Sequence, residues 1–470
     1  MKILDPHAID GKIPAPDEQF DLIVVGAGRA GTTSAIRAAL SGASVLLIDE
    51  NPVAGAMIGN DVPLFFGGRA TAAVQHPDRL VEQLFRANPE LEAAFDAGVD
   101  VRFATVAWGL YVPNAALRAL PGPLLGIADS EASRMVGFRR LMLATGARDV
   151  AIAFPGWDQP GVMGAQGFAA LLTRYDALAS RRIVVVGSGE LALHTARLAL
   201  EAGIEIAGIV EIGDRIEGNA PLAESLGVPV FLSHTIAATQ GGIDGVERVT
   251  LAPLTDDSER TILHCDTIVL AIGVTPATEL IEAAGTVANG LVQLVGDSAT
   301  LQPPSDERLL AWSSALGRYT VPETFVCQCE AVTRADLLGV QPPRYLDRPA
   351  RLATRSLATL LADGPAHPDQ IKRLTRAGMG PCQGRRCREQ VRCLLAAAQG
   401  VVPSEIPVAS FRAPVRPVPL SVLADWDEGA DMTAGWDVWF GIPTQWTPYA
   451  VIGTPQELEH VTGLGGTLHV

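Results

Sequence analysis

Short apolar runs, each followed by a glycine-rich turn, occur twice along the chain. The first is in FDLIVVGAGRAGTTSAIRAALSGASVLLIDE, residues 20–50, where Leu22 to Val25 form an uninterrupted apolar segment. Such a segment is typical of a buried parallel strand. A helical pattern and a second apolar run follow the turn. This stretch therefore predicts a strand, a tight turn, a helix and a second strand.

The first turn has the spacing GxGxxG at Gly26, Gly28 and Gly31, with Arg29 and Ala30 between the last two glycines. In a dinucleotide-binding fold the first glycine permits the sharp turn and the second lets the backbone approach a pyrophosphate. The third lets the helix pack closely on the strand, and the N–H groups that open the helix attract phosphate. We predict a dinucleotide site here; the alternative is a unit of the same shape that binds nothing.

Two further features belong to this predicted site. Asp49, next to Glu50, ends the second strand, where a carboxylate can accept hydrogen bonds from ribose hydroxyls. In RRLMLATGARD a strand runs into a small-residue turn at Thr145 and Gly146, where the backbone can pass near a cofactor. This segment resembles the ATG segment of flavoproteins with two dinucleotide-binding domains, and the resemblance favours FAD at the first site.

The same pattern returns in RRIVVVGSGELALHTARLALEAGIEIAGIVE, residues 181–211, with Gly187 and Gly189 in the turn. DTIVLAIGVTP, residues 266–276, repeats the later small-residue turn. Together they predict an α/β fold in which one Rossmann-like domain is inserted in another, the layout of pyridine-nucleotide-dependent flavoprotein reductases. The second site would hold NAD(P), another adenine nucleotide, or nothing, because a fold alone does not supply a function.

In those reductases, a strand that ends in a Gly-Asp pair returns to the flavin. Gly296 and Asp297 take this place here, followed by a helical pattern, and Asp297 is the predicted flavin-contacting acid. The approach to the pair is short and its flanking residues differ from the usual pattern. A shallower site, or a site for a different adenine nucleotide, therefore stays open.

Four of the six cysteines form two groups, Cys327-x-Cys329 and Cys382-x4-Cys387. Four thiolates suit a structural zinc ion or a [2Fe–2S] cluster. Zinc sites more often have two residues between paired cysteines, so the spacing favours iron and sulfur.

The surroundings of the second cysteine pair support the cluster prediction. A helical pattern follows the pair and stops near Gly400, and Arg385 and Arg386 could offset negative charge on a thiolate-ligated cluster. The remaining Cys265 and Cys393 are predicted to be buried small apolar residues.

Composition narrows the class of protein. Hydrophobic residues make up 48% of the 470 residues and charged residues 19%, which predicts a large folded core. The net charge of −16 argues against a nucleic-acid partner. The N-terminal segment has no signal-peptide pattern, and no apolar run approaches the ~18 residues of a membrane span. Sparse cysteines fit a reducing compartment, so we expect a cytoplasmic protein.

Three segments carry a family resemblance: VCQCEAVT, TRAGMGPCQGRRC and FRAPVRPVPLSVLA. Together they resemble the larger flavoprotein subunit of opine oxidases and of hydrogen cyanide synthase, and the α subunits of multimeric proline, hydroxyproline and sarcosine dehydrogenases. The cysteine segment resembles the small α-helical bacterioferritin-associated-ferredoxin fold, which implies a [2Fe–2S] cluster. A longer spacer between the cysteine pairs and the segment after residue 424 depart from the pattern. That last segment contains Trp426, Trp436, Trp439 and Trp446, which suit an interface or a cover over the chain's own core.

The resemblance implies that amine or amino-acid oxidation occurs on a smaller, FAD-containing β subunit similar to amino-acid oxidases. It also implies a small ferredoxin-like γ subunit, with an FMN where two subunits meet. This chain would relay electrons to an acceptor such as a quinone, which would allow peripheral attachment to a membrane. The eight histidines are scattered and form no acid–base set, so no catalytic residue is assigned. The alternatives are a self-contained NAD(P)H-dependent reductase and a non-catalytic scaffold protein.

The expected domain limits follow from these motifs. They are 18–155 with 276–320 for the FAD-binding domain, 156–275 for the inserted domain, 325–400 for the [2Fe–2S] module, and 401–470 for a connector and aromatic tail.

Overall fold

The computed structural model describes residues 15–16, 18–52, 69–114, 117, 120–256, 258–343, 345–346, 354–424 and 454–456. The chain divides into two units, Met1–Val418 and Pro419–Val470. In the second unit the described residues include one short helix, α16 (Leu420–Ala424). The four tryptophans predicted to form an interface or a cover lie outside the described residues.

A seven-stranded sheet forms the first layer of the larger unit, in the order β3-β2-β1-β6-β5-β4, with β17 also paired to β6. The strands from Leu22 to Val25 and from Val45 to Ile48 are buried because other elements cover both faces of the sheet. The bounds are β1 (Glu18–Val25), β2 (Val45–Ile48), β3 (Asp100–Arg102), β4 (Val106–Tyr111), β5 (Leu124–Ala128), β6 (Ser133–Leu143) and β17 (Val292–Leu294). Strands β3, β2, β1, β6 and β17 are mutually parallel, as short uninterrupted apolar runs predict.

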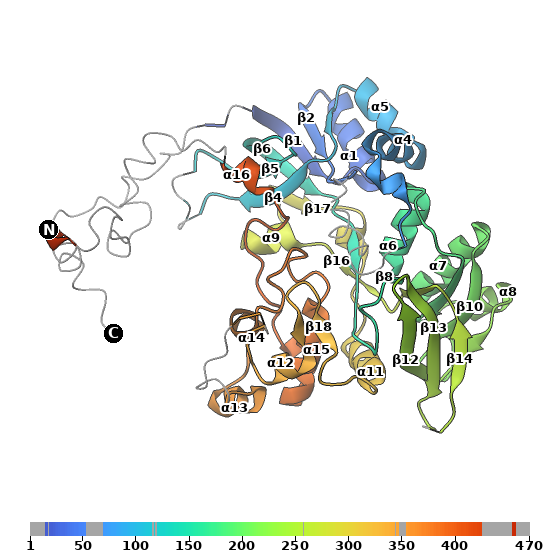
Figure 1. Cartoon of the computed structure of the whole chain (residues 1–470). Helices are drawn as coiled ribbons and strands as arrows, with labels where there is room; N and C mark the ends of the chain where they lie inside the picture. The colour runs from blue at the N-terminus through green and yellow to red at the C-terminus, as the bar shows by residue number, and fades with distance from the viewer. Residues whose placement is uncertain are drawn as a thin grey trace. The chain divides into compact units, whose positions relative to one another are not determined.

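Helices α1 (Arg29–Leu40) and α5 (Glu90–Asp96) cover one face of the first sheet and appear in blue beside it in Figure 1, and α9 (Glu279–Ala283) packs on the other face. The 3₁₀ turn η2 (Ala72–Gln75) and α4 (Pro77–Ala87) place Ala73 and Leu80 in the core of the second sheet, and the short α10 (Asp297–Thr300) follows β17. Leu91 and Ala94 of α5 join the core on one face, and Leu280 and Ile281 of α9 join it on the other.

A second, fully parallel sheet has the order β11-β10-β9-β15-β8. Its bounds are β8 (Val162–Gly164), β9 (Arg182–Val186), β10 (Glu205–Val210), β11 (Val230–Phe231) and β15 (Thr267–Leu270). An antiparallel sheet of β12 (His234–Gly242), β13 (Gly245–Pro253) and β14 (Thr261–His264) packs on one face. On the other lie α6 (Ala165–Ala169), η3 (Ala170–Arg174), α7 (Glu190–Glu201) and α8 (Ala220–Ser225).

Helix α11 (Asp306–Gly317) packs in the core of this second part through Leu309, Trp312 and Leu316. It falls within the segment predicted to belong to the FAD-binding domain, which ends at residue 320. The large apolar side chains of α11 share the core of the second sheet, whereas β17, earlier in the same segment, pairs with the first sheet. Cys265 and Cys393 lie in this same core and are buried, as predicted.

The chain crosses from the first sheet to the second and back along one antiparallel strand pair. β7 (Ala147–Asp149) carries it out, and β16 (Val274–Pro276) carries it back. The two strands each follow a predicted small-residue turn, so the crossing lies beside both of those turns.

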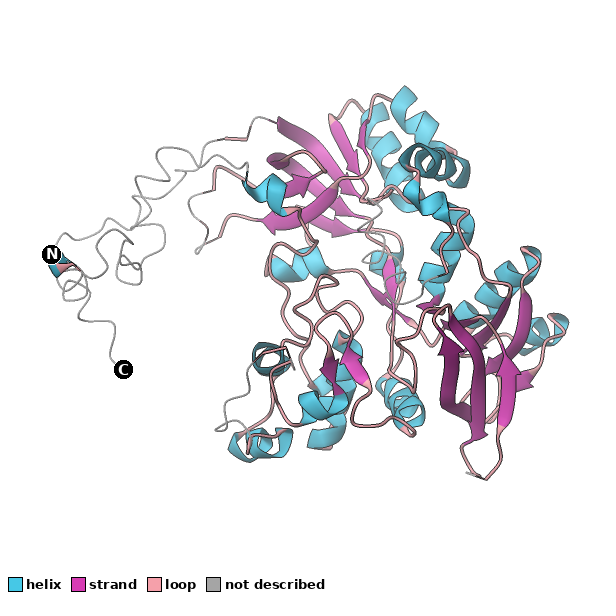
Figure 2. Cartoon of the chain, in the orientation of Figure 1, coloured by secondary structure: helices cyan, strands magenta, loops and turns pink. Residues whose placement is uncertain are grey.

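The cysteine-bearing segment is mainly helix and loop (Figure 2). It consists of a short strand pair, β18 (Phe325–Cys327) and β19 (Val332–Thr333), with α12 (Arg334–Leu338), α13 (Leu357–Asp363), α14 (Pro368–Thr375) and α15 (Arg388–Gln399). These elements share their own core. Helix α15 ends at Gly400, whose φ of +68° is left-handed, which confirms the predicted stop.

The segment after α15 contributes to the core of the first sheet. After the 3₁₀ turn η5 (Pro403–Glu405), Phe411 and Val415 are buried in it. The backbone N–H of Val415 donates to the carbonyl of Trp108 over 2.8 Å. The start of the predicted connector, which begins at residue 401, is therefore anchored to the first sheet.

Arg148 on β7 joins the cysteine-bearing segment to the rest of the unit. Its guanidinium lies 2.8 Å from a carboxylate oxygen of Glu389 on α15 and 3.2 Å from one of Glu279 on α9. It also donates to the backbone carbonyl of Arg385 over 3.0 Å. Burial would raise the pKa of Glu389, but the charge and hydrogen bonds of Arg148 hold that pKa below its usual value. Arg148 thus links β7, α9 and α15, and the ion pair of Arg388 with Glu282 also joins α15 to α9.

Replacing Arg148 with methionine should lower the free energy of unfolding by about 3–5 kcal/mol, because both buried carboxylates would lose the guanidinium that contacts them. Urea denaturation followed by circular dichroism measures this change. In the control, Arg182→Met removes the pair with Glu205, whose side chains are 44% and 64% exposed, and should cost less than about 1 kcal/mol. Equal losses in the two variants would contradict a special role for Arg148.

Candidate functional site

A cavity of about 580 Å³ lies beside the first glycine turn and the strand crossing. This volume falls within the range of about 300–1,000 Å³ that is typical of small-molecule and cofactor sites. Ten of the predicted site residues line it: Gly26, Gly28, Arg29, Ala30, Gly31, Asp49, Glu50, Thr145, Gly146 and Asp297. The structure therefore brings together three segments that are far apart in the sequence.

The glycines of the first turn meet different surroundings. Gly26 has a φ of +105°, and a Cβ there would lie 2.3 Å from the carbonyl oxygen of Ala144. A Cβ on Gly31 would lie 1.9 Å from the carbonyl oxygen of Gly26, so helix and turn are in backbone contact. Gly28 has no atom within 4 Å of its Cβ position. The turn is thus closed toward the protein and open toward the cavity, as pyrophosphate binding requires.

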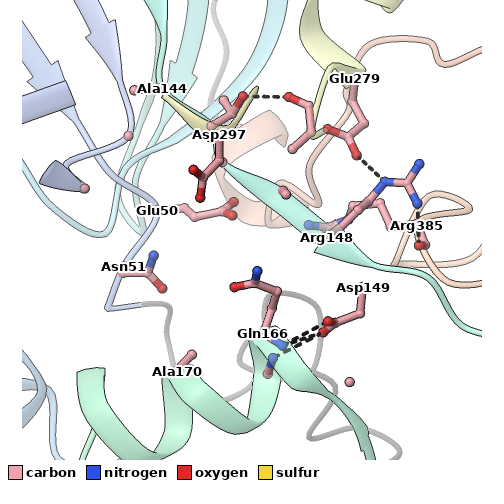
Figure 3. A pocket seen from close by; sticks show the side chains of 18 of the residues that line it. Glu50, Asn51, Ala144, Arg148, Asp149, Gln166, Ala170, Glu279, Asp297 and Arg385 are labelled. Atoms are coloured by element: carbon pink, nitrogen blue, oxygen red, sulfur yellow. Dashed lines mark hydrogen bonds and ion pairs between the residues drawn. The ribbon is translucent and has the colours of Figure 1, made fainter. Parts of the chain in front are cut away.

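The two acidic residues that follow β2, Asp49 and Glu50, make different contacts. One oxygen of Asp49 accepts from the backbone N–H of Ala27 over 2.6 Å, and the other accepts from both the backbone and the side chain of Asn51. Asp49 therefore braces the glycine turn. Glu50 extends into the cavity in Figure 3, as does Asp297. Glu50 pairs with Arg416 over 2.7 Å, and sequence reasoning had missed Arg416 because only tertiary packing brings it here.

The cysteine-bearing segment forms part of the same cavity wall. Gln328, Arg385 and Arg386 line the cavity, and each is next to or within three residues of a predicted cluster cysteine. The side-chain Nε2 of Gln328 is buried and has no hydrogen-bond partner among the described residues. A polar ligand atom would satisfy this donor. Sequence reasoning gave no role to Gln328, and its position between two cysteines was the only available signal.

The four predicted cluster cysteines meet as two thiol pairs. Cys327 interacts with Cys387, and Cys329 interacts with Cys382. All four are free thiols, and all but the half-buried Cys329 are buried. A Cβ on Gly380 would lie 2.3 Å from the Cβ of Cys329, so the loop before α15 packs directly on the first cysteine pair.

The charge around these thiols is uneven. The interaction with Cys329, and then the cations Arg386 and Arg385, hold the pKa of Cys382 below its usual value, although burial acts in the opposite direction. The interaction with Cys327 and burial raise the pKa of Cys387. In the described parts of the chain, no three or more side chains of His, Cys, Asp or Glu are arranged as a set of metal ligands. The thiols thus converge in pairs and beside cations.

The two other predicted residues, Gly187 and Gly189, form the second turn and do not line this cavity. Gly187 has a φ of +113°, and a Cβ there would lie 2.6 Å from the carbonyl oxygen of Ala271. The backbone of the second turn therefore repeats that of the first.

Asp149 ends β7 in the cavity wall, and Figure 3 shows it directed toward the start of α6. Its carboxylate accepts from the backbone N–H of Gln166 over 2.9 Å and from that of Gly167 over 3.2 Å. Burial raises the pKa of Asp149 to about 6, although these hydrogen bonds and Arg386 act in the opposite direction. The charged form of this carboxyl therefore costs free energy in the folded protein.

This raised pKa predicts a pH-dependent stability. In the unfolded chain an Asp has a pKa of about 3.9. The contribution of Asp149 to the free energy of unfolding is therefore fully present below pH 4 and is lost as the pH rises through 6. Asp149→Asn keeps an acceptor but cannot ionise. Its free energy of unfolding relative to wild type should rise by about 2–3 kcal/mol from pH 4 to pH 7.

Urea denaturation at several pH values measures this difference. In the control, Asp244→Asn in an exposed turn, the profile should stay parallel to that of wild type. A parallel profile for Asp149→Asn as well would show that the buried carboxyl does not titrate in this range.

Comparison with known proteins relates these features to characterised chains. The sequence model of the pyridine nucleotide-disulphide oxidoreductases matches residues 20–300, and that of the sarcosine oxidase A3 domain matches residues 344–426. The chain is 25% identical to the A subunit of opine oxidase from Agrobacterium tumefaciens, over 86% of this chain and 91% of that protein. It is 25% identical to the HcnB subunit of hydrogen cyanide synthase from Pseudomonas aeruginosa, over 85% of this chain and 97% of that protein.

The alpha subunit of sarcosine oxidase from Rhizobium meliloti is 24% identical over 86% of this chain, and the match covers 42% of that longer protein. The resemblance predicted from the cysteine-bearing segments is thus confirmed. Among solved structures, L-proline dehydrogenase from P. horikoshii has a TM-score of 0.50 and 18% identity, over 86% of this chain and 80% of that one. This likeness concerns the fold.

Within the described residues, none of the helices combines the length and apolar character needed to cross a bilayer. The oxidoreductase match covers more than half of the 470 residues and includes both glycine turns. This family is one of flavin-containing enzymes. Because the match covers most of the chain, the chain belongs to the pyridine nucleotide-disulphide oxidoreductase family.

Proposed function

We propose that this chain is the flavin- and iron–sulfur-containing subunit of a multi-subunit dehydrogenase or oxidase that acts on an amine or amino acid. The observation that carries the proposal is the shared cavity wall. The glycine turn and Asp297 line the same cavity as Gln328 and Arg385 from the cysteine-bearing segment. The relatives named as subunits of opine oxidase, sarcosine oxidase and hydrogen cyanide synthase support this assignment.

The residues of the cavity fit FAD. The open space over Gly28 and the start of α1 would take the diphosphate. Glu50 is better placed than Asp49 to accept from ribose hydroxyls, because both oxygens of Asp49 already accept from the protein. Thr145, Gly146 and Asp297 would border the rest of the cofactor.

The cysteine-bearing segment carries the donor types of a [2Fe–2S] cluster, four cysteine thiols, which the described residues place as two pairs and not as one ligand set. The partly buried Arg385 and Arg386 would offset negative charge on thiolates. Zinc with four cysteines is the competing occupant. When bound, the two cofactors would supply one- and two-electron transfer and so relay electrons to an acceptor such as a quinone.

Substrate oxidation is assigned to a partner. The polar groups that line this chain's cavity are backbone, hydroxyl, carboxylate, amide and guanidinium groups, and the eight histidines provide no acid–base set. We therefore infer a smaller FAD-containing β subunit, a small ferredoxin-like γ subunit, and an FMN where subunits meet. The names of the relatives as subunits support a heteromeric assembly.

The flavin assignment predicts that alanine at two neighbouring glycines has different effects, one on flavin binding and the other on folding. Gly28→Ala should fold normally and lose flavin, because its methyl group would project into the cavity. Gly31→Ala should fail to reach the native fold, because its Cβ would collide with the Gly26 carbonyl. Thermal melting and the flavin released from purified protein distinguish the two. Full flavin content in a folded Gly28→Ala variant would contradict the assignment.

The cluster assignment predicts iron that depends on the four cysteines. Purified wild-type protein should contain about two iron atoms per chain, and Cys327→Ser or Cys382→Ser should lose the iron while the flavin stays. Metal analysis and the visible absorption spectrum measure both. The control Cys265→Ala changes a buried cysteine outside the segment and should keep its iron. One zinc ion per chain in place of iron in the wild-type protein would refute the proposed electron relay.

A further inference from the structure

The two glycine turns share their backbone geometry and differ in what stands over the second glycine. Gly26 and Gly187 have φ angles of +105° and +113°, and each would bring a Cβ against the carbonyl of the alanine that ends a neighbouring strand. The Cβ position of Gly28 is open. The Cβ position of Gly189, by contrast, lies 3.3 Å from the Oε2 atom of Glu217.

The loop after β10, residues 211–219, holds Glu217 against the second turn. The backbone N–H of Glu217 donates to the Ser188 hydroxyl over 2.9 Å, and that of Gly218 donates to the Ser188 carbonyl over 2.9 Å. A Cβ on Gly218 would lie 3.0 Å from the carbonyl carbon of Gly189. The loop is thus in backbone contact with the second turn. The first turn, by contrast, faces a cavity at the corresponding place.

Arg308 on α11 fixes the carboxylate from the other side. Its guanidinium lies 2.6 Å from Glu217 and 2.7 Å from Glu211. Glu211 is fully buried and accepts from the Ser188 hydroxyl over 2.7 Å. The same guanidinium lies 5.3 Å from the ring centre of Trp312, which anchors α11 in the core. Turn, loop and helix therefore form one connected network.

We propose that Glu217 occupies the place of a dinucleotide diphosphate at the second turn, and that Arg308 latches it there. The second glycine of such a turn is where a pyrophosphate approaches the backbone. The start of α7 favours an anion, and the chain supplies that anion itself. A diphosphate would have to displace Glu217 and would meet like charge. NAD(P) therefore does not bind this turn, and the chain takes its electrons from another source.

This inference goes beyond the proposed function, because it concerns the second turn and requires neither flavin nor iron. The test is a calorimetric titration of the full chain with NAD⁺ and with NADP⁺, in the presence and absence of excess FAD. Binding that FAD abolishes belongs to the first cavity. Binding that FAD leaves unchanged belongs to the second turn, so the two sites are measured separately.

Wild type should show no FAD-insensitive binding. Glu217→Ala should gain it, with an affinity higher than that of wild type by about tenfold or more, because the carboxylate nearest to Gly189 is removed, while Glu190 and Glu211 remain. Glu217→Gln, which keeps a partner for Arg308, should gain less. Glu211 still pairs with Arg308 in both variants, so both should fold.

The matched control is Glu224→Ala, which removes an exposed carboxylate from α8 without touching the turn and should behave as wild type. FAD-insensitive binding of NAD⁺ or NADP⁺ to wild type would overturn the proposal. A Glu217→Ala variant that binds no better than wild type would also overturn it, because Glu217 would then not be the obstacle.

Discussion

Arg148 leaves β7 at the point where the chain crosses between its two parallel sheets, and its buried guanidinium lies between Glu279 and Glu389. A buried cation of this kind is stable only while its partners stay in place, since an unpaired charge in the interior costs several kcal/mol. The geometry of the cavity depends on this constraint. By holding α15 and the carbonyl of Arg385, Arg148 keeps the cysteine-bearing segment in the cavity wall.

The two glycine turns have the same local motif but different surroundings. Their backbones are alike because a strand, a tight turn and a helix allow few conformations. What stands over the second glycine depends on the loop after the next strand. In the first turn Gly28 faces a cavity, and in the second Glu217 stands over Gly189. A motif therefore predicts the shape of a site, whereas its neighbours decide whether a ligand can enter.

Stretches of chain that are far apart in the sequence meet at the cavity, and they bring different kinds of group. The first turn contributes open backbone, Glu50 and Asp297 contribute carboxylates, and the cysteine-bearing segment contributes Gln328 with its unsatisfied amide. This mixture is suited to a cofactor with a charged diphosphate at one end and a polar ring at the other. The segment that carries the four cysteines also contributes residues to the wall of this cavity.

The sequence alone determined the local features: both glycine turns, the strands around them, the helix that stops at Gly400, and the burial of Cys265 and Cys393. These follow from side-chain periodicity and from sterics within some thirty residues, which act wherever the segment lies. Tertiary structure decided the pairing of Glu50 with Arg416, which lie 366 positions apart, and the place of α11 in the second core. It also decided that Glu217 covers the second turn. Such contacts depend on how distant elements pack, and no local pattern records which charged side chain will meet which.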